Sequence, residues 1–357
     1  MLAASVPAGC PWTVKPLDVH ADGLPLVVDA ARERDPDVLA AWLRVNHAWV
    51  RERLQTVGAI LFRGFAVDGP AAFERVARAV DDRLQQDYLG TSPRNALTPY
   101  VFTASELPGF YPIPQHCEMS FIRNPPRRLF FCCLVPPAPG MGETPLTDFR
   151  RVLADIDPAV RARFEARGLR IVRNYSGPDG GGRLDPWKLK RWDEMFGTTD
   201  RSVVEAKCRA EGFEPTWTDG GGLRLVSTQP VTRTHPDTGT SLWHNHVTTF
   251  HGSQAAGEYR RIHALRPSLR TFFLWQVARV LEVAQRRRPV ERRAMECTHA
   301  DGAEIARADV EAVREAVWRH LVVFPWRQGD VLAIDNYVVA HGRLPYAGPR
   351  EIAVAWA

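Results

Sequence analysis

Residues 115–121 read Gln-His-Cys-Glu-Met-Ser-Phe, and a second short motif, His-Gly-Arg, occupies residues 341–343. Side chains two residues apart in a β-strand point to the same face, so a strand through this stretch would place His116 and Glu118 side by side. Only a folded sheet can bring His341, far along the chain, to the same point. Two imidazoles and one carboxylate on one face of a metal ion leave its other positions open, which is typical of non-heme iron(II) oxygenases. The two motifs therefore predict one metal centre built from His116, Glu118 and His341.

A His-x-Glu pair also arises by chance in chains of this size, so the neighbouring sequence carries weight. An apolar, strand-like run covers residues 129–134, and a turn-rich segment that contains Thr144 follows it. Residues 331–334 are again apolar and precede His341, and Arg350 lies on the next strand-like segment. This order of segments around the two motifs favours the interpretation as a metal centre.

With these motifs the chain resembles the Fe(II)/2-oxoglutarate-dependent dioxygenases of the taurine dioxygenase-like superfamily. Within that group it is most similar to the clavaminate synthase-like and syringomycin-hydroxylase-like members, and the resemblance runs from Leu61 to the last residue. It implies a double-stranded β-helix, or jelly roll. It also implies that His116, Glu118 and His341 bind Fe(II), and that 2-oxoglutarate and O₂ are co-substrates.

The resemblance further assigns residues to 2-oxoglutarate. Arg350 matches the family arginine that binds the distal carboxylate, and the planar fork of an arginine suits that group. The register is open, because Glu351 follows where some relatives have a second arginine, so Arg343 is the alternative. Thr144 matches the family threonine that hydrogen-bonds the same carboxylate; the other interpretation is an ordinary turn residue before Pro145.

The reaction that the resemblance implies is hydroxylation of an unactivated C–H bond. The expected substrate is an amino acid or an amino-acid-derived natural-product intermediate, free or bound to a carrier protein. Desaturation or ring closure with the same iron site stays open, and a non-enzymatic jelly roll that binds a small ligand is the alternative from another class. Related halogenases replace the carboxylate ligand by a small residue, whereas Glu118 is present here, so we do not expect halogenation.

The substrate pocket is less well marked. Candidate residues are Phe121, Arg173, Trp192 and Trp243. Arg173 could bind a substrate carboxylate or form a structural salt bridge, and the aromatic residues could form an apolar wall. Residues 243–250 are expected to form a strand beside the site. Its pair His244 and His246 could instead bind a second metal, but no cysteine or carboxylate lies at zinc-like spacing beside it.

Length and patterning predict one mainly β domain with helical additions, over residues 1–357, with a helical insert at about 255–320. The chain is 45% hydrophobic, which suffices for a large core. Amphipathic periodicity predicts helices over residues 38–54 and 73–84, and apolar runs predict strands over 58–64 and 169–175.

Composition also limits which partners the protein can have and which cellular compartment it can occupy. There is no run of about 18 apolar residues, so no membrane span is expected. The first eleven residues lack a signal-peptide pattern, and six cysteines without regular spacing favour reduced thiols in a cytoplasmic protein. The net charge is +5, but the run at 286–288 has glutamates nearby. This favours a solvated helix over a nucleic-acid-binding stripe; a docking patch for an acidic partner is the other interpretation.

Overall fold

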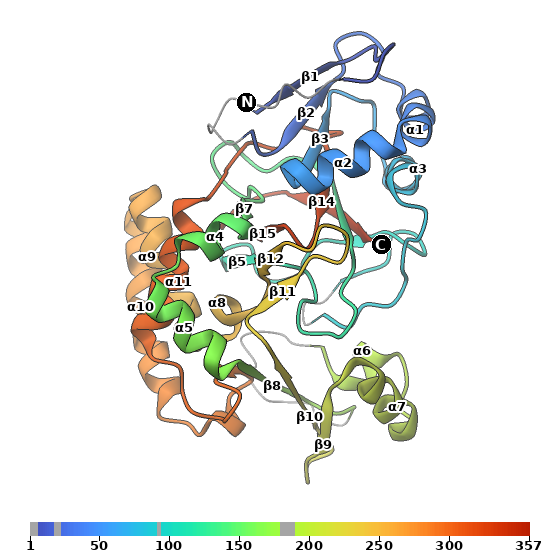
Figure 1. Cartoon of the computed structure of the whole chain (residues 1–357). Coiled ribbons are helices and arrows are strands. Elements are labelled where there is room, and N and C mark those ends of the chain that lie inside the picture. The colour runs from blue at the N-terminus through green and yellow to red at the C-terminus, as the bar shows by residue number, and fades with distance from the viewer. Residues whose placement is uncertain (1–5, 18–22, 91–93, 179–189) are drawn as a thin grey trace.

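A computed structural model describes residues 6–17, 23–90, 94–178 and 190–357, and every structural statement below refers to these residues. They form eleven α-helices and sixteen β-strands in four sheets (Figure 1). The chain is thus mixed α/β, so the prediction of a mainly β chain was too narrow. The prediction failed because helices pack across a face of the largest sheet and are not confined to its edges.

The major sheet has seven strands. In spatial order they are β1 (Thr13–Pro16), β2 (Leu26–Asp29), β3 (Ala59–Arg63), β14 (Val331–Asp335), β6 (Arg128–Val135), β16 (Glu351–Trp356) and β4 (Phe102–Thr103). Only β2 and β3 pair in parallel. Strands from the N-terminal and C-terminal parts of the chain therefore meet in the middle of this sheet, where β14 lies between β3 and β6.

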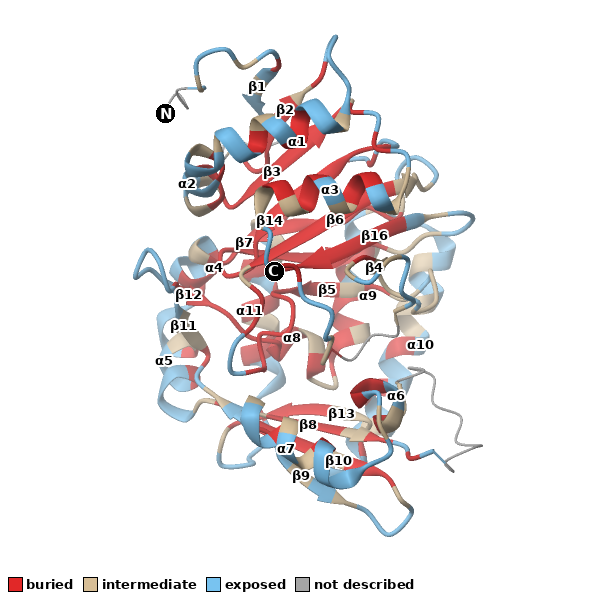
Figure 2. Cartoon of the chain, turned by 90° about the vertical axis from the view of Figure 1, so that its right-hand side faces the viewer, coloured by how far each residue is buried: buried red, intermediate tan, exposed pale blue. Residues whose placement is uncertain are grey.

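The two faces of this sheet serve different cores. Along β14, Val331 and Ala333 join the core beneath three helices, whereas Leu332 and Ile334 join the inner core. The helices on the outer face are α1 (Pro36–Val45), α2 (His47–Val57) and α3 (Pro70–Val80). Figure 2 shows β3, β6, β14 and β16 as mainly buried and β1 as mainly exposed, and it shows the outward sides of α1 and α3 as exposed. The expected helix over 38–54 is two helices, which meet at Asn46.

A three-stranded minor sheet completes the jelly roll. Its strands are β5 (Ile113–His116), β15 (Val339–Arg343) and β7 (Leu146–Asp148), with β15 in the centre. His341 lies opposite His116 on one side and Leu146 on the other. The ring of His341 is 5.0 Å from that of Phe131 in β6, so the metal motifs lie between the minor and major sheets.

The remaining elements surround this sandwich. A four-stranded sheet runs β13 (Met295–Thr298), β8 (Leu169–Tyr175), β10 (Leu223–Gln229) and β9 (Glu214–Trp217), and β11 (Thr232–Thr234) pairs with β12 (Ser241–Trp243). The helices are α4 (Phe149–Asp155), α5 (Pro158–Arg167), α6 (Trp192–Phe196), α7 (Arg201–Glu211), α8 (Val247–Phe250), α9 (Gln254–Leu265), α10 (Leu269–Arg286) and α11 (Arg307–Arg319), with a 3₁₀ turn at Val290–Arg292. Figure 1 places α9, α10 and α11 along one flank and α6 and α7 beside β9 and β10.

The region expected as a helical insert contains α9, α10 and α11, but β13 interrupts it and pairs with β8. The expected strand over 243–250 was wrong, because β12 ends at Trp243 and α8 begins at Val247. None of the described helices is long and apolar enough to cross a membrane. The six cysteines are all unpaired.

Candidate metal centre

His116, Glu118 and His341 lie together. Each offers one ligand atom, and these atoms all lie within 4.8 Å of one another. All three side chains are buried. The sheet register explains the two histidines: they are direct partners across β5 and β15, and their rings are 4.6 Å apart.

Glu118 reaches the site by a different route from the one predicted. Strand β5 ends at His116, so Glu118 lies in the following turn, and strand alternation does not explain its direction. Met119, next in the chain, has a φ of 52°, a left-handed conformation that is uncommon outside glycine. The carboxylate ligand therefore sits on a tight turn, and that turn needs support from elsewhere in the fold.

The protonation states suit metal binding. The Nδ1 atom of His116 lies 2.8 Å from the carbonyl of Pro114; an N–H donated there leaves the Nε2 lone pair free for a metal. Burial lowers the pKa of His116. Burial, together with the neighbouring His116 and Arg94, holds the pKa of His341 well below its usual value. Two neutral imidazoles and a carboxylate form a donor set that fits Fe(II).

Two further residues hold the carboxylate of Glu118, and sequence reasoning missed both. Arg94 donates from Nη2 to Oε2 at 2.7 Å, and the Tyr88 hydroxyl donates to Oε1 at 3.3 Å. The guanidinium of Arg94 also lies over the Tyr88 ring, 4.5 Å from its centroid. Only 6% of the Arg94 side chain is exposed, and its Nε and Nη1 atoms have no hydrogen-bond partner. Neither residue belongs to a periodic pattern or motif that could have marked it.

The residues predicted to hold 2-oxoglutarate lie side by side. Arg350 donates from Nη2 to the Thr144 hydroxyl at 3.4 Å and from Nε to the carbonyl of Gly142 at 2.8 Å. Trp326, which was not predicted, donates from its indole to the same hydroxyl at 3.1 Å. Burial, with the nearby Arg343, lowers the pKa of Arg350 to about 10. A partly buried guanidinium that forms no ion pair with an acidic side chain in the described ranges suits a carboxylate ligand.

This group lies beside the metal centre. Thr144 comes two residues before Leu146, which pairs with His341 in the minor sheet. Arg343, the alternative, is committed elsewhere: Nη1 donates to the carbonyls of Ser105 and Leu107, and Nη2 to those of Pro108 and Tyr111. The geometry therefore favours Arg350 over Arg343 as the co-substrate residue.

The four predicted substrate residues divide into two groups. The ring of Phe121 lies 5.0 Å from that of His246, which lies 4.9 Å from that of His116, and Arg173 stacks on Phe121 at 4.2 Å. The other two residues have ring contacts with side chains outside the metal centre: Trp192 packs on Trp217, and Trp243 packs on Phe164. The structure thus brings Phe121 and Arg173 together near the metal centre.

The second histidine pair does not form a metal site in the described structure. His244 stacks on Tyr337 at 4.9 Å, and the Nδ1 atom of His246 lies 2.5 Å from the Ser120 hydroxyl. Within the described ranges, His116, Glu118 and His341 are the one group of three or more side chains that could hold an ion. Burial lowers the pKa of His246 well below its usual value, so it adds a neutral ring beside the centre.

Comparisons with known proteins agree with this geometry. Residues 15–356 match the family model described as taurine catabolism dioxygenase TauD, TfdA family. The chain is 29% identical over 344 residues to the dapdiamide synthesis protein DdaC of Enterobacter agglomerans, covering 96% of this chain and 94% of that protein. It is 29% identical over 316 residues to a clavaminate synthase-like protein of Arabidopsis thaliana, covering 87% and 84%.

A solved structure supports the fold. The PvcB protein of Pseudomonas aeruginosa has a TM-score of 0.51 to this chain, with coverage of 99% of this chain and 93% of that protein at 13% identity. Because the family match spans nearly the whole sequence and includes the assembled His-Glu-His group, the chain belongs to the TauD/TfdA family of Fe(II)- and 2-oxoglutarate-dependent dioxygenases.

Proposed function

We propose that this dioxygenase hydroxylates an unactivated C–H bond of an amino acid or of an amino-acid-derived natural-product intermediate, free or bound to a carrier protein. Two relatives support the substrate class: one is by name a dapdiamide synthesis protein, and the other is clavaminate synthase-like. The observation that carries the reaction type is Glu118, which stands in the group with His116 and His341.

Glu118 argues against halogenation. Its carboxylate takes the coordination position that a halide would need, and its negative charge disfavours a further anion on the same ion. This carboxylate forms a buried ion pair with Arg94 and accepts a hydrogen bond from the Tyr88 hydroxyl. Hydroxylation is therefore expected over transfer of chloride.

The chain's own residues bind, orient and exclude water. Bound Fe(II) and 2-oxoglutarate activate O₂ and supply the oxidant, with succinate and CO₂ as co-products. His116, Glu118 and His341 would hold the metal, and Arg350 with Thr144 would orient the distal carboxylate of 2-oxoglutarate. All five side chains are buried or partly buried, which strengthens these charged contacts and protects the reaction from solvent.

Two measurements test this function. Fe(II) and 2-oxoglutarate added without oxygen should give a weak visible charge-transfer band, and His341→Ala should lose it. Candidate amino acids and carrier-bound aminoacyl groups should then be screened for accelerated succinate formation. The expected product is heavier by one oxygen atom, labelled from ¹⁸O₂, and contains no chloride when chloride is present.

Other results would redirect the proposal. A product lighter by two hydrogen atoms would indicate desaturation or cyclisation and would refute hydroxylation. The absence of the absorption band in the wild-type protein would favour a jelly roll that binds a small ligand without catalysis.

A further inference from the structure

Arg173 occupies a core position of strand β8. Leu169, Ile171, Arg173 and Tyr175 alternate along the strand on one face, and all four are buried. The other three belong to the inner apolar core. Arg173 is 0% exposed. A guanidinium thus stands where the strand pattern requires an apolar side chain.

Its surroundings do not neutralise its charge. The guanidinium packs against two aromatic rings, 4.2 Å from the centroid of Phe121 and 4.6 Å from that of Phe213, and Nη1 donates to the Tyr175 hydroxyl at 3.2 Å. The Nε and Nη2 atoms have no hydrogen-bond partner. No acidic side chain in the described part of the chain forms an ion pair with it. Two ring faces compensate a buried cation only in part, because removing its water costs more than they return.

The two unpartnered nitrogens form the edge that binds carboxylates elsewhere in this protein. Arg63 uses Nε and Nη2 to hold the two oxygens of Asp330 at 3.0 and 2.7 Å. Arg163 holds Asp309 in the same way at 2.9 and 2.6 Å. Such two-point pairs combine strength with a fixed orientation. In Arg173 this edge has no hydrogen-bond partner.

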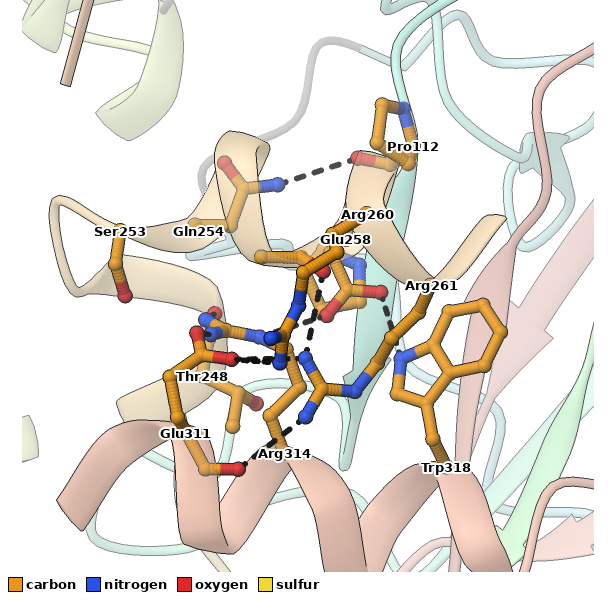
Figure 3. Close-up of polar contacts among 12 residues, drawn as sticks. Pro112, Thr248, Ser253, Gln254, Glu258, Arg260, Arg261, Glu311, Arg314 and Trp318 are labelled. Carbon is orange, nitrogen blue, oxygen red and sulfur yellow. Dashed lines mark hydrogen bonds and ion pairs between the residues drawn. The ribbon is translucent and has the colours of Figure 1, made fainter. Parts of the chain in front are cut away.

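A second fully buried arginine, Arg314, has acidic partners that compensate its charge. Arg314 is also 0% exposed, and its guanidinium lies between Glu258 and Glu311 (Figure 3). Its Nε donates to Glu258 at 3.0 Å, and the Trp318 indole donates to the other oxygen of that carboxylate at 3.1 Å. Arg314 thus has two acidic partners for its buried charge, whereas Arg173 has none in the described part of the chain.

The position of Arg173 connects it to the metal centre. Phe121, on which it stacks, contacts His246, whose ring lies 4.9 Å from that of the metal-centre residue His116. The positive charge of Arg173 also contributes to the lowered pKa of His246. The unpartnered edge therefore belongs to an arginine that two successive ring contacts link to the metal centre.

We propose that Arg173 binds a carboxylate of the substrate through Nε and Nη2, so that the substrate of this dioxygenase is an organic anion. The inference rests on the proposed function and narrows its substrate class. Contacts through the rings of Phe121 and His246 link this arginine to the metal-centre residue His116.

The first test compares thermal unfolding of the metal-free wild type with that of two variants. Arg173→Met removes an uncompensated buried cation and keeps an apolar stem, so it should melt at or above the wild-type temperature. Arg314→Met is the matched control and should melt well below it, because Glu258 and Glu311 lose their partner. A melting temperature of Arg173→Met below the wild type would mean that the guanidinium is structural and would overturn the proposal.

The second test uses acetate and its neutral isostere acetamide as probes. Zn(II) and N-oxalylglycine are present at saturation, so that the metal ligands and the co-substrate residues are occupied, and ionic strength is matched with sodium chloride. Acetate should raise the melting temperature of the wild type above that in acetamide. The difference should vanish in Arg173→Met and persist in Arg163→Met, whose arginine is at the surface.

Equal melting temperatures of the wild type in acetate and acetamide would refute the proposal, as would a difference that survives in Arg173→Met. Neither test requires turnover. A missing charge-transfer band or an unhydroxylated product would therefore count against the proposed reaction alone, and a missing acetate effect would count against the carboxylate receptor alone.

Discussion

Asn336 holds the peptide backbone of Glu118 from both sides. Its Oδ1 accepts from the N–H of Glu118 at 2.7 Å, and its Nδ2 donates to the carbonyl of the same residue at 3.0 Å. The same Nδ2 donates to the carbonyl of Pro126 at 2.8 Å. Asn336 is 0% exposed and directly follows strand β14 of the major sheet. It thus supplies the support that the turn after β5 lacks once strand pairing ends at His116.

Replacing Asn336 should weaken metal binding. Asn336→Leu keeps the approximate shape but leaves the buried N–H and carbonyl of Glu118 without partners, which costs about 1–3 kcal/mol of unfolding free energy. Metal affinity should fall by about 10–100-fold, as for other residues that orient a ligand. Zn(II) titration against a chromophoric chelator measures it. A wild-type affinity of Asn336→Leu for Zn(II) would show that the contacts of Asn336 with the Glu118 backbone do not support metal binding.

Arg94 and a metal ion compete for the charge of Glu118. In the metal-free protein, Arg94→Met leaves this carboxylate buried without its ion-pair partner, which costs about 3–5 kcal/mol. A bound dication takes over that compensation, so the cost is smaller in the loaded protein. By linkage the variant should bind Zn(II) about tenfold more tightly, or better, and be less stable without it. Urea unfolding with and without metal tests both. Weaker metal binding would show instead that Arg94 keeps Glu118 in its ligating position.

Arg350→Ala should raise the 2-oxoglutarate requirement by well over tenfold. Loss of a buried charge-assisted pair costs about 2–5 kcal/mol, and about 1.4 kcal/mol already corresponds to tenfold in affinity. The concentration of 2-oxoglutarate that half-saturates the anaerobic absorption band measures it. Arg343→Ala is the comparison: its guanidinium holds four backbone carbonyls, so it should lower stability and leave this concentration nearly unchanged. The reverse pattern would move the role to Arg343.

His244 should make the stability of the protein depend on pH. Burial, with the charge of Arg233, lowers its pKa to about 3, whereas the unfolded chain has a value near about 6.5. Below about pH 6.5 the unfolded chain binds a proton on this imidazole that the folded protein does not bind, so the free energy of unfolding falls as the pH falls. Between about pH 7.5 and 5 the unfolding free energy should drop by about 2 kcal/mol more in the wild type than in His244→Phe. That variant keeps a ring on Tyr337 but cannot titrate. Parallel curves for the two proteins would show that His244 is not buried in its neutral form.

The sequence predicted the metal ligands because each lies in a short, recognisable motif. The arginine–threonine pair assigned from the family resemblance, Arg350 and Thr144, lies within hydrogen-bonding distance. Asn336, Arg94 and Tyr88 could not be found in this way. They act on Glu118 across 218, 24 and 30 residues of chain, and such contacts leave no periodic signal.

The errors in secondary structure have local causes. Asn245 interrupts the strand expected over 243–250, because its Oδ1 accepts from the N–H of Val247 and its Nδ2 donates to the carbonyl of Val231. Asn46 ends α1 through a bond from its side chain to the carbonyl of Trp42, which splits the helix expected over 38–54. In both places a short polar side chain satisfies the backbone in a way that hydrophobic periodicity does not register.

The order of the metal-centre residues along the chain also bears on when the complete site can form during synthesis. A ribosome delivers His116 and Glu118 long before it delivers Asn336 and His341. Until the later segment arrives, an emerging chain offers iron two neighbouring ligands, one of them on an unsupported turn, and no third. Because Asn336 and His341 lie close together in the sequence and contact Glu118 and His116 only in the folded sheets, the complete three-ligand site forms only in molecules whose sheets have closed.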